Sequence, residues 1–305
     1  MHMHREILRE IGHQLDEDIF PRIMNGGIVT PGEAAVPTST WAMEVNHERP
    51  STRRPKTGSR TWRPREEGEG KTWGCGTSGN ASPFICTDLK HQYEGELTAV
   101  QEAYPGARAW IQNEGLWLIT ESALLPGLSQ KAVFLTGIPF SRTRTVRGWG
   151  FWKGVPLKYP SWIGPRHTNS PDGSICAFEP RDGTWKLGDS LLTLLDLYTL
   201  WALRHLHLQI FKRWPGRQVA HFVYERLVEL SLSEYCGCGS NQQYGHCCRE
   251  NDLKGDLVLE ALSYFHMGCG IRVVPEIVTT FIQSQDKPPQ IADLLFPHVL
   301  QFPDI

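Results

Sequence analysis

A tight cluster of four cysteines is the feature that most limits how this chain can fold. Residues 236–248 read CGCGSNQQYGHCC, so two close pairs of cysteines are separated by eight residues. Two pairs of thiolates at this spacing suit a tetrahedral cage that binds zinc and excludes water. We therefore predict one structural zinc ion whose four ligands are Cys236, Cys238, Cys247 and Cys248.

The residues between the cysteines fit this prediction. Gly237 and Gly239 let the backbone fold so that N–H groups point at the sulfurs. His246 is an alternative ligand in place of Cys247 or Cys248. Disulfides are the competing interpretation, but the N-terminal residues lack the apolar run of a secretion signal, and the close clustering is typical of a metal site in a reducing compartment. Because four thiolates fill a tetrahedral site, we expect no catalysis at the metal.

The composition indicates a globular protein that needs neither nucleic acid nor a membrane. The 305 residues are 40% hydrophobic and 21% charged, and the net charge is -2. No overall field therefore attracts a polyanion or an anionic membrane. The long Leu-rich stretch, residues 187–211, contains several charged and histidine residues, so we predict a buried amphipathic helix and no membrane span. We expect a cytoplasmic protein.

The chain divides into four predicted parts. Residues 1–46 are an N-terminal extension that begins with a short helix. Residues 47–86 have almost no aliphatic side chains, so we expect a flexible linker or long loop. Residues 87–215 form a predicted α+β domain. Residues 216–305 form a predicted helical region that carries the cysteine cluster.

The α+β domain has a clear order of predicted elements. A helix begins near Thr87 or Asp88, either of which can serve as its N-cap, and its apolar residues recur every three or four positions. Three β-like runs joined by short turns then favour an antiparallel meander. These runs cover residues 107–112, 116–122 and 132–140.

The rest of the chain is predicted to be largely helical. After an irregular stretch from Trp149 to Arg166, a long helix begins near Trp185, with Asp189 as an acid of its first turn. Pro215-Gly216 ends this helix. The later elements are a helix over 217–232, a helix over 253–267, a strand over 271–282 and a short helix near Ile291.

A lone thiol, Cys176, follows a tight turn at 171–173 in the segment HTNSPDGSICAF, residues 167–178. A thiol held beside a turn, with a histidine and an amide upstream, is typical of a positioned nucleophile. Asn169 can donate its amide to a developing oxyanion, and His167 can act as a base or brace the loop. The competing interpretation is a small buried cysteine after a turn.

This region resembles the ubiquitin-conjugating (UBC) enzymes, most closely the divergent bacterial ones. The family has a first helix, an antiparallel meander, a His-Pro-Asn loop, the active cysteine, a tryptophan and a long helix. The resemblance covers residues 87–212, with Thr168 where the family has proline and one residue fewer between Asn169 and Cys176. The matching segments are His167-Thr168-Asn169, Asp172–Cys176, Trp185 and Lys186–Leu200.

The resemblance implies a UBC-like fold and thioester chemistry. Cys176 would carry the C-terminus of a ubiquitin-like or other protein as a thioester and pass it to a lysine of a target. Asn169 would stabilise the oxyanion, and His167 would support the loop. The assisting acid is not assigned, although Glu179, Asp182 and Asp189 are near in sequence.

The resemblance also implies partners. Some bacterial relatives are encoded beside antiphage cyclic-nucleotide signalling systems, so the conjugated carrier can be a nucleotidyltransferase. The chain has no nucleotide-binding glycine fingerprint, so any ATP-driven activation requires a separate activating enzyme. Two alternatives stay open: a catalytically inactive UBC-like adaptor, and a cysteine peptidase that removes conjugates by means of Cys176 and His167.

The cysteine cluster in turn resembles the SEC-C motif. This short zinc knuckle occurs at the C-terminus of the SecA translocation motor and on many otherwise unrelated proteins. Here the resemblance covers residues 236–248 and includes Gly239, Ser240 and Tyr244. It implies a structural or docking role for the zinc.

Overall fold

The computed structural model describes residues 2–24, 26–29, 86–125, 131–154, 161–178, 183–220, 222–266 and 272–291. All of them fall in one compact unit. Most of the predicted linker lies outside these residues, as do Glu179 and Asp182. Among the described helices, none combines the length and apolar character that crossing a membrane requires.

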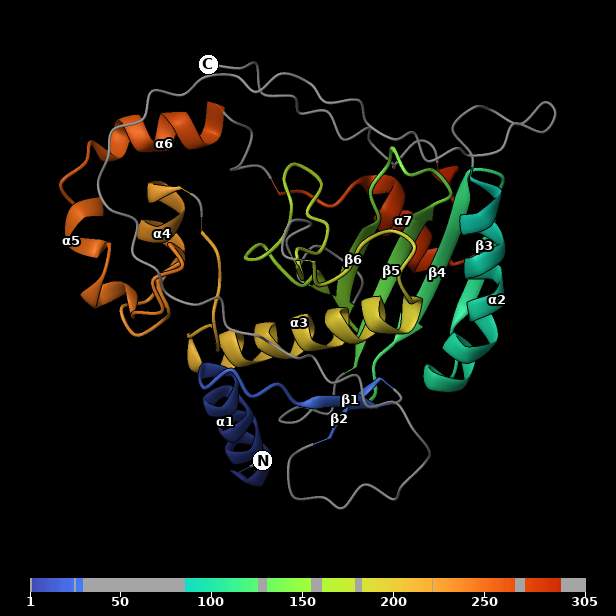
Figure 1. Ribbon diagram of the computed structural model, residues 1–305, viewed down its shortest axis with the longest axis horizontal. Helices are drawn as coiled ribbons and strands as arrows, with labels where there is room; N and C mark the ends of the chain where they lie inside the picture. Colours follow the sequence, from blue (N-terminus) through green and yellow to red (C-terminus); the bar gives the residue numbers. More distant parts are fainter. Residues whose placement is uncertain are drawn as a thin grey trace, which may run out of the picture. The chain divides into compact units, whose positions relative to one another are not determined.

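The architecture is α+β, and its larger sheet is an antiparallel meander whose four strands follow chain order (Figure 1). The three predicted strands are confirmed to within a residue or two at each end. A fourth strand, β6, occupies part of the stretch expected to be irregular. The strands are β3 (Arg108–Ile111), β4 (Gly115–Glu121), β5 (Ala132–Pro139) and β6 (Arg147–Trp152).

Three helices contribute to the core on one face of this sheet, and α1 joins that core by packing against α3. They share one apolar core with Leu116 and Leu118 of β4, and side chains from all three helices are buried in it. Neighbouring side chains on a strand point to opposite faces, so Trp117 of β4 belongs to the core on the other face. The three helices are α1 (His2–Asp16), α2 (Thr87–Ala103) and α3 (Leu191–Phe211).

The helix starts correct two predictions. The N-cap of α2 is Cys86, without a side-chain hydrogen bond, so neither Thr87 nor Asp88 caps the helix. The N-cap of α3 is Ser190, whose hydroxyl accepts a hydrogen bond from the Leu192 N–H. Asp189 therefore precedes the helix, and its carboxylate accepts a hydrogen bond from the Lys186 N–H at 2.9 Å.

The opposite face of the sheet is covered by α7 (Glu276–Ser284), where the sequence predicted a strand. The β-branched composition suggested that strand. The buried side chains, however, are Val278, Phe281 and Ile282, which share one face only at helical spacing. Phe281 packs against Trp117 with ring centroids 6.0 Å apart. Packing against the sheet therefore outweighs the local β preference.

The C-terminal part of the described chain consists of short helices. The helix predicted over 217–232 is shorter, α4 (Val223–Glu229). A single 3-10 turn, η2 (Tyr244–His246), lies inside the cysteine cluster. Helices α5 (Arg249–Asp252) and α6 (Leu257–His266) follow it. A small hairpin near the N-terminus pairs β1 (Arg22–Met24) with β2 (Gly27–Val29).

Two glycines of β6 allow α3 to lie close to the sheet. A Cβ atom at Gly148 would meet the ring of Tyr198 at 2.7 Å, and one at Gly150 would meet the ring of Trp201 at 2.7 Å. Both rings belong to α3 and are buried. The glycines are therefore required by packing, which explains why β6 lacks the pattern of a typical strand.

We expect Gly148→Ala to destabilise the protein by about 1–3 kcal/mol, because the added methyl group overpacks a buried ring. Gly95 supplies the control, since it is exposed in α2 and a Cβ there would meet nothing within 4 Å. Gly95→Ala should stabilise the helix by about 0.5–1 kcal/mol. Urea unfolding of both variants measures the difference. Wild-type stability in Gly148→Ala would contradict this close packing.

Candidate functional site

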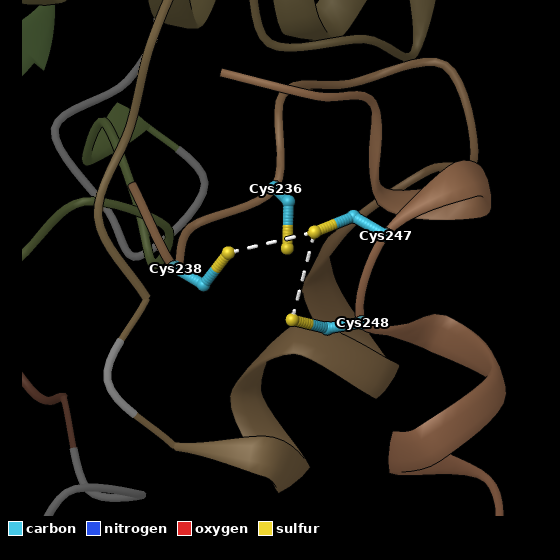
Figure 2. Close-up of side chains that lie close together, drawn as sticks. All are labelled: Cys236, Cys238, Cys247 and Cys248. Atoms are coloured by element: carbon cyan, nitrogen blue, oxygen red, sulfur yellow. Dashed lines mark hydrogen bonds between the residues drawn. The ribbon is translucent and has the colours of Figure 1, made fainter. Parts of the chain in front are cut away.

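The four predicted cysteines converge on one point (Figure 2). All their sulfurs lie within 4.8 Å of one another. The sulfur of Cys247 is 3.6 Å from that of Cys238 and 3.8 Å from that of Cys248. A tetrahedral zinc–thiolate site requires sulfurs about 3.8 Å apart, whereas a disulfide requires about 2.05 Å. The cluster can therefore hold a metal ion, and His246 is not part of it.

The backbone of this knuckle explains its glycines. Gly237 packs so closely on Ala220 that a Cβ would lie 2.4 Å from the Ala220 nitrogen. Gly239 has a φ of +82°, which only glycine adopts readily. The N–H groups of Cys238 and Cys248 hydrogen-bond the sulfur of Cys236. The predicted backbone donors to the sulfurs are therefore present.

The thiols differ in their readiness to ionise. Burial raises the pKa of Cys236, and burial together with the neighbouring cysteines raises the pKa of Cys248. The Ser240 hydroxyl lowers the pKa of Cys238 to about 6 by hydrogen bonding. Four crowded thiolates repel one another, so a cation that binds them removes the main obstacle to their ionisation. This electrostatic setting fits a metal ion.

The segment that presents Cys176 is a closed, cross-braced loop. Thr168 and Ile175 form an antiparallel bridge. The Asn169 N–H donates to the Ser174 carbonyl at 2.7 Å, and the Cys176 N–H donates to the His167 carbonyl at 3.0 Å. Each bond joins the two arms of the turn, so the position of the thiol is set by the backbone on both sides.

A buried aspartate fastens this loop to the sheet. The Asp172 carboxylate accepts hydrogen bonds from the Ser174 N–H at 3.0 Å and from the Ser174 hydroxyl at 2.8 Å. It also forms an ion pair with Arg147 of β6 at 3.4 Å. The Trp149 indole N–H donates to the Asp172 carbonyl at 2.9 Å. The turn signal in the sequence therefore marks an anchored loop.

The predicted catalytic residues do not all meet in one place. Cys176 is half-buried and lines a pocket of about 190 Å³ together with His167. Asn169 lines a different pocket, beside Ile175. Its amide nitrogen donates to the Ile175 carbonyl at 3.0 Å and to the Ser174 hydroxyl at 3.2 Å. In this arrangement the Asn169 amide closes the loop.

His167 is held by its neighbours. Its ring packs on Trp214 with centroids 4.0 Å apart, and its Nε2 shares a hydrogen bond of 3.1 Å with the Gln218 side-chain oxygen. Removal of the ring from water, aided by the charge of Arg166, lowers the pKa of His167 well below its ordinary value. The imidazole is therefore neutral at physiological pH, and its contacts fit the predicted support of the loop.

The pocket beside Cys176 is built by α3 and the segment that follows it. Its apolar lining includes Leu197, Leu200 and Trp201, at the three- and four-residue spacing of one helical face. The sequence therefore contained a pattern from which this apolar side of the pocket could have been predicted. Its polar side chains, which sequence reasoning missed, are Arg204, Arg217 and Gln218.

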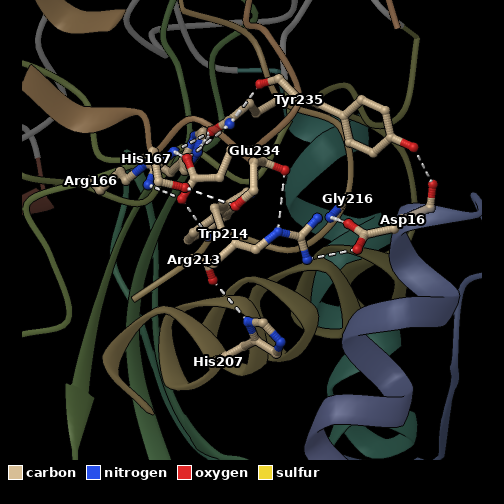
Figure 3. Close-up of polar contacts among 12 residues, drawn as sticks. Asp16, Arg166, His167, His207, Arg213, Trp214, Gly216, Glu234 and Tyr235 are labelled. Carbon is tan, nitrogen blue, oxygen red and sulfur yellow. Dashed lines mark hydrogen bonds and ion pairs between the residues drawn. The ribbon is translucent and has the colours of Figure 1, made fainter. Parts of the chain in front are cut away.

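A buried ion pair links this pocket to the cysteine knuckle (Figure 3). Arg166, next to His167, pairs with both carboxylate oxygens of Glu234, and the two side chains are only 8% and 1% exposed. The Trp214 N–H donates to the same carboxylate at 2.7 Å. Gln218 accepts from Arg166 at 2.7 Å and donates to Glu234 at 3.3 Å. Glu234 precedes the first ligand of the cluster by two residues.

Comparison with known proteins finds no matching family model, no matching curated protein and no matching solved structure. Function must therefore be inferred from the two sites themselves. These are the cysteine cluster and the Cys176 pocket, joined by the pair of Arg166 and Glu234.

We expect Glu234→Gln to destabilise the protein by about 3–5 kcal/mol, because it leaves a buried guanidinium without its counter-charge. Urea unfolding measures the loss. Replacing both Arg166 and Glu234 with methionine should cost less than the single change, since no charge is then buried alone.

The pair of Arg217 and Asp18 provides the control, since its side chains are 52% and 41% exposed. Asp18→Asn should cost less than about 1 kcal/mol, as is usual for exposed pairs. If Glu234→Gln and Asp18→Asn lowered the free energy of unfolding equally, the buried pair would contribute no more to stability than an exposed one, against this prediction.

Proposed function

We propose that this chain is a UBC-like cysteine acyltransferase. Cys176 accepts the C-terminus of a carrier protein as a thioester and passes it to a lysine of a target. The observation that carries this proposal is a half-buried thiol at a pocket, on a cross-braced loop. This loop follows a four-stranded antiparallel meander and precedes a long helix, which is the order of elements in ubiquitin-conjugating enzymes.

Thioester transfer depends more on how the reacting groups are positioned than on a strong general acid or base. The Cys176 thiolate attacks the activated carbonyl of the carrier, a C–S bond forms, and the activating group leaves. A lysine amine then attacks the thioester carbonyl, the C–N bond forms and the C–S bond breaks. Cys176 leaves as a thiolate, and the amine nitrogen gives up a proton that can return the thiolate to a thiol. Thioesters react readily with amines, so holding the carbonyl in place supplies much of the rate. An anchored loop suits this task.

Two features favour a transferase over the alternatives. An inactive adaptor has no need of a thiol that reaches a pocket, whereas Cys86, for comparison, is buried in the core. A peptidase needs a base that takes the proton of its thiol. The ring of His167 is committed to Gln218 and Trp214, which supports a bracing role.

We further propose that the cluster binds structural zinc as a SEC-C-like knuckle. Four thiolates complete a tetrahedral zinc site and leave no open position for a substrate. The zinc would hold the backbone of 236–248 and thereby the preceding Glu234. By the UBC resemblance, we propose as carrier a ubiquitin-like protein or an antiphage nucleotidyltransferase, supplied by a separate activating enzyme.

We expect wild-type protein to form an adduct that thiols reduce when it is incubated with the carrier, its activating enzyme and ATP. Cys176→Ser should instead trap an oxyester that resists reduction, because a serine ester reacts more slowly with thiols and amines. Non-reducing gels and mass spectrometry distinguish the two. Cys86→Ala is the matched control and should behave as wild type. A reducible adduct that persists in Cys176→Ser would contradict the proposal, because the carrier would then be attached to another cysteine.

We expect the purified protein to contain about one zinc ion per chain, measured by elemental analysis. Cys247→Ser should lower zinc retention, because a tetrahedral site then lacks one thiolate. Cys86→Ala should retain the metal. The finding of disulfides among the four cysteines, or of metal-free protein that is fully folded, would contradict the proposed zinc site.

A further inference from the structure

The pocket beside Cys176 contains a cation that makes no direct ion pair with any described residue. Arg204 of α3 lines this pocket, and its Nε is shielded from solvent without a hydrogen-bond partner. Among the described residues, no carboxylate lies within ion-pair distance of it. Its guanidinium instead lies 5.8 Å from the ring centre of Phe20. Burial lowers the pKa of Arg204 to about 10, so the side chain stays charged at neutral pH.

The arginines around Arg204 are all paired. Arg213 contacts Asp16 at 2.7 Å, and Arg217 contacts Asp18 at 2.5 Å. Arg166, which precedes the pocket residue His167, is neutralised by Glu234. In the part of the chain that the structure describes, Arg204 is therefore the pocket arginine without a direct ion pair, and the negative charges of Asp16 and Asp18 act on it only from a longer distance. Arg204 is half-buried, and a guanidinium that reaches a pocket without a direct partner can bind an anionic ligand there.

We propose that Arg204 forms a carboxylate-binding subsite, so that the preferred acyl donor carries an acidic group close to the carbonyl that Cys176 takes. This inference rests on the proposed acyltransferase function and adds a substrate class to it. A guanidinium presents two parallel N–H groups that match a carboxylate. The apolar walls formed by Leu200 and Trp201 suit an adjoining aliphatic segment. A carrier tail with an acidic residue beside an apolar one fits this pocket.

The subsite can be tested without a carrier, by alkylation of Cys176 in the full-length protein. The thiolate attacks the methylene carbon of iodoacetate or iodoacetamide, the C–S bond forms, and iodide leaves. The two reagents differ only in their carboxylate and amide. The ratio of their rates therefore cancels changes in the reactivity of the thiol itself. Mass spectrometry of the peptide that contains Cys176 gives each rate.

We expect Arg204→Gln to lower the ratio of the iodoacetate rate to the iodoacetamide rate by about tenfold or more, the usual effect of losing one charge-assisted hydrogen bond. Arg204→Lys should lower the ratio less than Arg204→Gln does, since lysine keeps the positive charge but lacks the two parallel N–H groups of the guanidinium. Arg9→Gln makes the same change of charge at an exposed site on α1, outside the pocket, and should leave the ratio as in wild type.

A second arm uses only the wild-type protein, so that it does not depend on the folding of any variant. Succinate should slow the labelling of Cys176 by iodoacetamide in a saturable way, and succinamide should not. An unchanged ratio in Arg204→Gln, or equal protection by succinate and succinamide, overturns the subsite. A fall as large in Arg217→Gln overturns it too, because that result indicates a diffuse positive field.

The outcome is separable from that of the proposed function. Alkylation reports the subsite even if no carrier is ever transferred. Conversely, a thioester on Cys176 whose rate of formation is insensitive to Arg204→Gln supports the transferase and contradicts the subsite. Where a carrier forms the thioester, changing the acid in its tail to the matching amide should slow wild type and leave Arg204→Gln unaffected.

Discussion

The buried ion pair between Arg166 and Glu234 is the interaction on which the arrangement of both sites depends. Two charges removed from water are tolerated only when their remaining hydrogen-bonding capacity is also satisfied. Here Gln218 and the Trp214 N–H complete the shell around the carboxylate. Because Arg166 adjoins His167 and Glu234 adjoins the knuckle, one desolvated pair fixes the Cys176 pocket and the cysteine cluster relative to each other.

The four-cysteine cluster and the single Cys176 differ in what surrounds their sulfurs. The cluster has four mutually close thiols, and the described residues add no further ligand to it, so a bound metal would be enclosed by sulfur. Its effect on the pocket would pass through the backbone around the cluster, which meets the pocket segment at Glu234 and at Gly237, whose carbonyl accepts a hydrogen bond from the Ala220 N–H at 3.1 Å. Cys176, in contrast, lines a pocket. The proposal therefore places the chemistry at Cys176 and gives the cluster a structural role.

The amino-acid sequence was sufficient for the cysteine cluster, for strands β3, β4 and β5 and for the long helix α3, because each has a strong local pattern. It was insufficient where packing overrides that pattern. Gly148 belongs to a strand because Tyr198 needs the space, and Val278 belongs to a helix because the sheet offers that helix a buried face. Arg204 and Glu234 were missed because a pocket assembled from distant segments leaves no local spacing to recognise.

The geometry of the loop also bears on how an oxyanion at Cys176 would be stabilised. Both amide hydrogens of Asn169 are engaged, one with the Ile175 carbonyl and one with the Ser174 hydroxyl. Donating to an oxyanion would cost the loop one of these bonds, and with it part of the bracing that positions the thiol. The described loop thus favours a structural role for Asn169.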